Sequence, residues 1–103
     1  MSAQRLAYRY AKALVDLAKE QGKLENVKGN IDALIAANDN RDFYLMLKSP
    51  VINKTKKRAI FKAIFGEQFE EVTLKFMDLL TTKGREAALP EIAQEFLLSL
   101  IHI

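Results

Sequence analysis

The sequence contains no cysteine, and this absence excludes several kinds of protein at once. Without thiols there are no disulfides, no thiolate nucleophiles and no cysteine metal sites. Proline and glycine are also scarce, with 2 and 4 residues among 103, so a disordered low-complexity chain is not expected. We therefore expect one folded domain, which is the usual outcome for a chain of this length.

Long apolar runs are absent as well. A membrane-spanning helix needs about 20 consecutive apolar residues, and no run in this sequence approaches that length. The chain begins MSAQRLAYRYAKAL, with charged residues at regular intervals and without the apolar segment of a secretory signal. We interpret this opening as part of the mature fold and expect no direct insertion into a membrane.

The motifs of common catalytic and nucleotide-binding sites are missing too. Neither GxxxxGK[ST] nor GxGxxG occurs. The single histidine, His102, has no candidate metal ligand near it in the sequence, so we assign it no role. Acidic residues such as Asp16 and Asp32 fall on expected polar helix faces, where solvation explains them without a catalytic pair. We expect no enzyme activity, no cofactor and no metal.

A helical period of apolar residues, by contrast, runs through the whole chain. From Gln4 to Gln21 apolar residues recur every three or four positions. Ser2 and Asn53 are expected N-caps, and Gly22 and Gly84 are expected C-caps. The same period predicts further helices over residues 24–37, 41–47, 54–65, 70–83 and 86–98. Because the loops are short, neighbouring helices should pack antiparallel. The predicted fold class is all-α, a compact bundle of five to six antiparallel-packed helices.

Positive charge is concentrated in one stretch of the fourth predicted helix. The basic cluster consists of Lys54, Lys56, Lys57, Arg58 and Lys62. The formal charge is +3, so the rest of the chain sums to −2. The cluster is either the phosphate-binding surface of an RNA-binding bundle or a solvated helix face. We favour the solvated face, because no exposed aromatic residues are interleaved with the lysines. On that reading the inward residues are Ala59, Ile60, Ala63, Ile64 and Phe65.

The first predicted helix carries two features that one core-facing stripe does not explain. Tyr8 and Tyr10 are two positions apart, so their side chains point about 200° away from each other. One of them must stand at a rim, either as a core-edge residue or as an anchor for a partner. The apolar arc also extends to Leu6, Ala13 and Val15. This width fits a deeply buried helix or a groove for an amphipathic partner helix, and the sequence leaves both open.

Three blocks of sequence resemble one protein family in the same order. They are RYAKAL with DLA at residues 9–18, LKSPVI at 47–52, and FMDLL, KGR and LPEI between residues 76 and 92. Together they cover about residues 5–97 and are similar to the N-terminal domain of the delta subunit of F-type ATP synthase, the oligomycin-sensitivity-conferring protein family.

That resemblance implies a non-catalytic stator role on the cytoplasmic face of the bacterial inner membrane. The implied six-helix bundle sits on the crown of the catalytic head and holds the N-terminal helix of an alpha subunit in a groove between its first and fifth helices. The implied groove residues are Tyr10, Ala13, Leu14 and Leu17 on the first helix, and Phe76, Leu79, Leu80 and Lys83 on the fifth. Arg85 would cap the fifth helix or meet an acid on the partner. In the family a separate C-terminal domain, not included in this sequence, joins the b subunits of the peripheral stalk.

The last six residues depart from the family pattern. We expect the family domain to cover residues 1–97 and residues 98–103, LSLIHI, to be a tail of other origin. One reading frame of a common transposon-derived sequencing adapter also encodes LSLIHI. The hypothesis is that the tail is an artefact of a truncated reading frame, and the source DNA read tests it.

Overall fold

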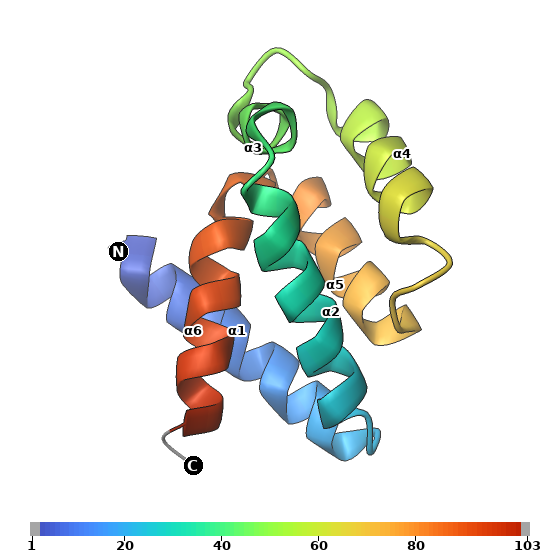
Figure 1. Cartoon of the computed structure of the whole chain (residues 1–103). Coiled ribbons are helices and arrows are strands. Elements are labelled where there is room, and N and C mark those ends of the chain that lie inside the picture. The colour runs from blue at the N-terminus through green and yellow to red at the C-terminus, as the bar shows by residue number, and fades with distance from the viewer. Residues whose placement is uncertain (1–2, 102–103) are drawn as a thin grey trace.

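The computed structural model describes residues 3–101, which form six α-helices joined by short loops (Figure 1). No strand occurs within these residues, so the all-α prediction is confirmed. The first turn of the predicted last helix is a separate 3₁₀ turn, η1. The elements are α1 (Ala3–Glu20), α2 (Leu24–Asn38), α3 (Arg41–Lys48), α4 (Lys54–Phe65), α5 (Glu71–Thr82), η1 (Glu86–Ala88) and α6 (Leu89–Ile101).

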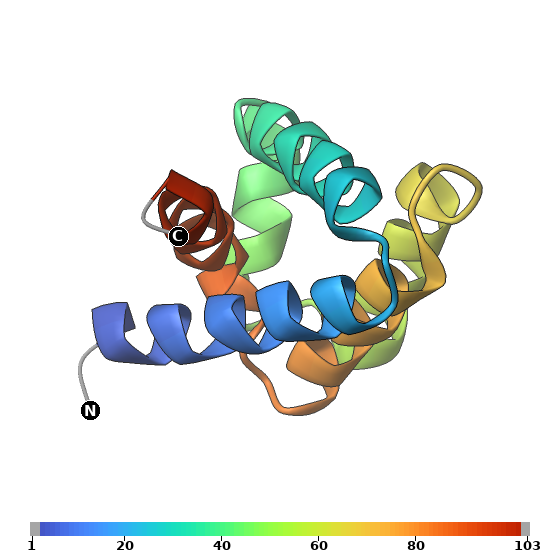
Figure 2. The same cartoon turned by 90° about the horizontal axis from the view of Figure 1, so that it is seen from below.

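Two antiparallel pairs and one crossing helix make up most of the bundle. In Figure 1, α2 and α6 run side by side in opposite directions, and so do α4 and α5. Figure 2 shows α1 running crosswise past both pairs. The most extensive helix contact is between α1 and α6. Small side chains at Ala7, Ala11 and Ala18 are fully buried on α1 and allow this close approach.

Helices α1 and α5 end in the same way. Gly22 and Gly84 have φ values of 67° and 72°, in the left-handed region that favours glycine. The next residues, Lys23 and Arg85, each donate a backbone N–H back to the helix at 2.8 Å, which completes a Schellman motif. The predicted Asn53 cap is also present, with its side chain accepting from the N–H of Lys56. The predicted Ser2 cap and His102 lie outside the described residues.

The inward face of α4 differs in part from the predicted one. Phe65 is buried and Ile60 is half-buried, as predicted. Phe61 is also buried, whereas three residues predicted to be buried are exposed: Ala59, Ala63 and Ile64. Phe43 on α3 contacts both phenylalanine rings, with centroid distances of 6.2 and 5.8 Å, and Phe69 stacks on Phe65 at 4.4 Å. Aromatic rings bury far more area than alanine, so the larger side chains decided which face of α4 points inward.

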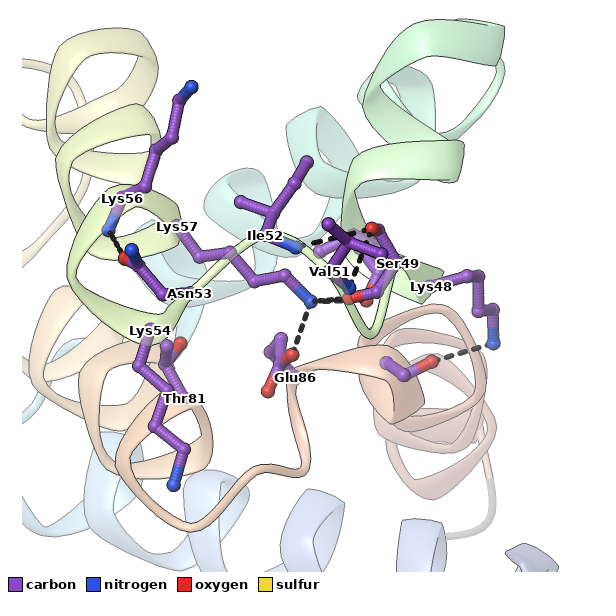
Figure 3. A network of polar contacts seen from close by, with 12 residues as sticks. Lys48, Ser49, Val51, Ile52, Asn53, Lys54, Lys56, Lys57, Thr81 and Glu86 are labelled. Atoms are coloured by element: carbon purple, nitrogen blue, oxygen red, sulfur yellow. Dashed lines mark hydrogen bonds and ion pairs between the residues drawn. The ribbon is translucent and has the colours of Figure 1, made fainter.

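A buried lysine ties α4 to two neighbouring segments (Figure 3). Lys57 is 2% exposed, and its Nζ donates to the carbonyl oxygens of Leu47 and Ser49 at 3.1 and 2.9 Å and to Glu86 at 2.5 Å. The expectation that the whole basic cluster faces solvent was therefore wrong for Lys57. Because all three ammonium donors are used, the charge is tolerated in the interior. The network fixes Glu86, which directly follows Arg85 at the corner between α5 and α6.

Helix α6 continues without a break through the position where we expected the family domain to end. Leu100 is half-buried against the core, whereas Leu98 and Ile101 are exposed. The origin of the last six residues stays a prediction. Among residues 3–101 no helix combines the length and the apolar character that a membrane crossing requires.

Candidate partner-binding groove

Two surface depressions lie between α1 and α5, and together they form what we call the α1–α5 groove. The basic end, of 390 Å³, is lined by Leu6, Arg9, Tyr10, Ala13, Lys83 and Arg85. The neutral end, of 310 Å³, is lined by Leu17, Gln21, Glu71, Val72, Lys75, Phe76 and Leu79. Early α1 residues thus share an end with late α5 residues, so the two helices run in opposite directions along the groove.

The rings of Tyr10, which lines the basic end, and Phe76, which lines the neutral end, contact each other. Their centroids are 6.2 Å apart at an interplanar angle of 72°, an edge-to-face contact. The Tyr10 hydroxyl accepts a hydrogen bond of 2.8 Å from Arg85 Nη1, and the guanidinium carbon lies 5.8 Å from the centre of the Tyr10 ring. Tyr10 is half-buried and held on two sides, so its ring is pre-positioned in the groove.

Tyr8 lies on the other side of α1. It is 49% exposed and lines a separate depression between α1 and α6. The expectation that the two tyrosines diverge is therefore confirmed, and Tyr10 is the one that stands at the edge of the groove.

The eight residues expected to bind a partner lie at different depths. Leu17 and Leu79 are 42% and 46% exposed, and Ala13 and Lys83 are exposed beside them. Tyr10 is half-buried, and Phe76 is buried but still lines the neutral end.

Leu14 and Leu80 have no exposed surface. Both occupy the core-facing stripe of their helices, so they support the groove from beneath and offer no area to a partner. The wide apolar arc of α1 divides in the same way, because Val15 is buried while Leu6 and Ala13 line the groove.

Arg85 is the lining residue whose role sequence reasoning did not resolve. Its backbone N–H caps α5, but its guanidinium binds Tyr10, which is 75 residues away in the sequence. No local pattern relates residues at that separation. The only available signal was the glycine at position 84, which predicts a sharp turn that redirects the chain after α5.

The start of α5 is held by α2, and this positions the neutral end. Asn30 is buried, and its Oδ1 accepts from the Glu70 N–H and the Thr73 hydroxyl, both at 2.9 Å. Asn26 donates to the Glu70 carboxylate at 2.9 Å, and Lys23 pairs with it at 3.2 Å. The hydrogen bond from Asn26, followed by the contact with Lys23, holds the pKa of Glu70 below its ordinary value.

The basic cluster is not one continuous cationic surface. Lys57 is buried, the Nζ of Lys54 donates to the Thr82 carbonyl at 2.8 Å, and Arg58 pairs with Asp78 at 2.9 Å. Lys56 and Lys62 remain exposed. With three of its five members engaged inside the molecule, the cluster offers a weaker phosphate-binding surface than its sequence indicates.

Other hollows have less definite chemistry. One of them, of 580 Å³, lies between α4 and α5 and is lined by apolar residues with charges of both signs, including Arg58, Lys62, Glu67 and Asp78. Within residues 3–101 no group of histidine and acidic side chains is arranged to hold a metal ion.

Comparison with known proteins places this geometry in context. Residues 6–101 match a family model described as ATP synthase delta (OSCP) subunit. The chain is 39% identical over 97 residues to ATP synthase subunit delta of Cytophaga hutchinsonii, covering 93% of this chain and 53% of that protein. It is 42% identical over 90 residues to the same subunit of Phenylobacterium zucineum, covering 85% and 49%.

A solved structure agrees with the sequence matches. A chain in the cryo-EM structure of the Toxoplasma gondii mitochondrial ATP synthase hexamer superposes with a TM-score of 0.83 at 27% identity, over 88% of this chain and 52% of that chain. The chain therefore spans about half the length of the relatives that it matches.

Proposed function

Because the chain belongs to the ATP synthase delta (OSCP) subunit family, we propose that it is a non-catalytic stator component that holds the N-terminal helix of an alpha subunit in the α1–α5 groove. The observation that carries this proposal is the groove itself. Two neighbouring helices of a bundle with a complete core still leave Leu17 and Leu79 more than two-fifths exposed across a shared depression. An amphipathic helix is the natural ligand for such a surface.

The construction of the groove suits a holding joint. Burial of apolar surface contributes roughly 25 cal/mol per Å² before the costs of association. Tyr10 is already fixed by Phe76 and Arg85, so little side-chain entropy is lost when a partner covers it. Pre-positioning of this kind lowers the dissociation rate, which is where most affinity differences between related complexes arise.

Binding to the alpha subunit would be one of two contacts made by a full-length member of the family. The family's longer members are about twice the length of this chain, and we propose that their remaining part binds the b subunits of the peripheral stalk. In that arrangement the bundle sits on the crown of the catalytic head, at the cytoplasmic face of the bacterial inner membrane. The joint would resist the torque of the rotor and so help to couple proton flow to ATP synthesis.

Calorimetric titration with a peptide from the alpha-subunit N-terminus of the same organism tests the proposal. A peptide of about 20 residues forms a helix of about 30 Å, long enough for the groove. We expect saturable 1:1 binding, weakened at least about fivefold by Leu79→Ala and more by Tyr10→Ala, because exposed apolar and aromatic anchors carry interface energy. Leu45→Ala on α3 is the matched control, since Leu45 is 50% exposed and lies outside the groove.

Salt separates this function from RNA binding by the basic cluster. Phosphate contacts lose affinity steeply between about 50 and 200 mM salt, whereas binding through mainly apolar contacts loses far less affinity over the same range. A folded domain that does not bind the peptide, or equal binding by the Leu79→Ala and Leu45→Ala variants, would contradict the proposal. In that case, RNA binding through Lys56 and Lys62 becomes the next experiment.

A further inference from the structure

Charge is distributed unevenly along the α1–α5 groove. Three cationic residues and no carboxylate line the basic end, namely Arg9, Lys83 and Arg85. At the neutral end the only charged residues are Glu71 and Lys75, which pair with each other at 3.0 Å. The groove therefore offers an apolar floor along its length and an excess of positive charge at one end only.

Helix capping does not account for the cationic side chains at the end of α5. The carbonyls of Leu79, Leu80 and Thr81 accept backbone N–H groups from Lys83, Arg85 and Gly84. The carbonyl of Thr82 accepts from the Nζ of Lys54. All four final carbonyls of α5 are thus satisfied without the side chains of Lys83 or Arg85.

The acids next to them in the sequence do not balance the charges of Lys83 and Arg85 either. Asp78 pairs with Arg58 on α4, and Glu86 is buried against Lys57. Lys83 is exposed at the groove rim, and Arg85 is fixed beside it by the Tyr10 hydroxyl. Two cations held next to an apolar surface, without local acids to neutralise them, form a surface that is complementary to an anionic group on a ligand.

We propose that the partner helix carries a carboxylate that sits against Lys83 and Arg85 and sets the register of the helix in the groove. This inference rests on the proposed function and adds the chemistry of its ligand. Tyr10 and Leu17 are seven residues apart on α1, which is about 10 Å along a helix. A partner running along the groove therefore places its carboxylate about two turns from the apolar residue that enters the neutral end.

The test combines charge reversal in the domain with neutral substitutions in the peptide. The alpha-subunit peptide is compared with variants in which each Glu or Asp is replaced singly by Gln or Asn, against the wild-type domain, Lys83→Glu and Lys19→Glu. Lys19 is the matched control, because it lies in the last turn of α1 but lines the depression on the α6 side. Both reversals therefore place the same charge change near a helix C-terminus.

We expect Lys83→Glu to weaken binding of the parent peptide about tenfold or more, and Lys19→Glu to change it less than about twofold. One of the Gln or Asn peptides should bind the wild-type domain about fivefold more weakly than the parent peptide does. The same two peptides should bind the Lys83→Glu domain with equal affinity. A peptide with Lys at that position should regain affinity for Lys83→Glu. If the parent peptide binds but every amide variant matches it, the carboxylate is overturned while the groove function stands. If the parent peptide does not bind the folded wild-type domain, both the groove function and the partner carboxylate are contradicted.

Discussion

Lys57 shows how a single residue can lie where its type is rarely found. Burial of a lysine that is 2% exposed is costly unless each ammonium donor has an acceptor, and Lys57 has two carbonyls and Glu86. The sequence does not indicate this burial, because Lys57 stands among four other cations and its acidic partner is 29 residues away. A hydrophobic pattern counts lysine as polar and assigns it to the surface.

Removing this lysine should be costly. Lys57→Met leaves Glu86 and two carbonyl groups buried without a donor, so we expect the free energy of unfolding to fall by about 3 kcal/mol. Urea denaturation measures this loss. The double variant Lys57→Met/Glu86→Leu should recover part of it, because no uncompensated charge remains. A loss below about 1 kcal/mol for the single variant would show that the pair is not buried as described.

Glu70 provides a prediction about pH. Its folded pKa lies below the ordinary value of 4.5, so its stabilising effect is complete above that value and is lost as the pH falls through the folded pKa. Asn26→Ala removes the largest cause, and Lys23→Gln removes the positive charge behind two smaller causes, so each should raise the pKa towards 4.5. An NMR titration of the Glu70 carboxyl checks both. Lys28 lies on α2 like Asn26 but pairs with Asp32. Lys28→Gln should therefore leave the Glu70 pKa unchanged.

At the scale of the elements, the positions of the helices could be predicted well and their faces less well. Apolar spacing, Asn53 and the two glycines place every helix of the described chain within a few residues of its observed bounds. On α4 the burial of Phe65 was predicted but that of Phe61 was not, because spacing treats Ala59 and Phe61 as equal when burial favours the larger ring. Periodicity also cannot separate Leu14, which is buried, from Leu17, which is exposed, since both fall on one broad apolar arc.

The paired glycine caps allow stability and binding to be separated. Gly22→Ala and Gly84→Ala each force an alanine to positive φ, and an added Cβ meets nothing closer than 3.9 Å at either site. Both should therefore lose about 1–2 kcal/mol of stability through backbone strain alone. Only Gly84→Ala displaces Arg85 from Tyr10, so only this variant should also weaken peptide binding when both variants are compared well below their unfolding temperatures. Equal affinities would show that the Arg85 contact does not shape the groove.

At the scale of the whole molecule, the candidate site is a product of tertiary packing. Its apolar residues could be placed on α1 and α5 through the family resemblance, but residue spacing within each helix does not say that the two helices are neighbours. Helix α1 crosses both antiparallel pairs and contacts α5, and this crossing makes the two helices neighbours (Figure 2). The excess of cations at one end likewise exists only because residues 9, 83 and 85 meet there.

The bond between Tyr10 and Arg85 joins two residues that are 75 positions apart, and this separation orders events during synthesis. When α1 emerges from the ribosome, the opposite wall of its groove has not yet been made. The surface is complete only after translation has passed residue 85 and the bundle has closed. An unfinished or unfolded chain therefore presents no groove and cannot bind the partner helix in place of a finished domain.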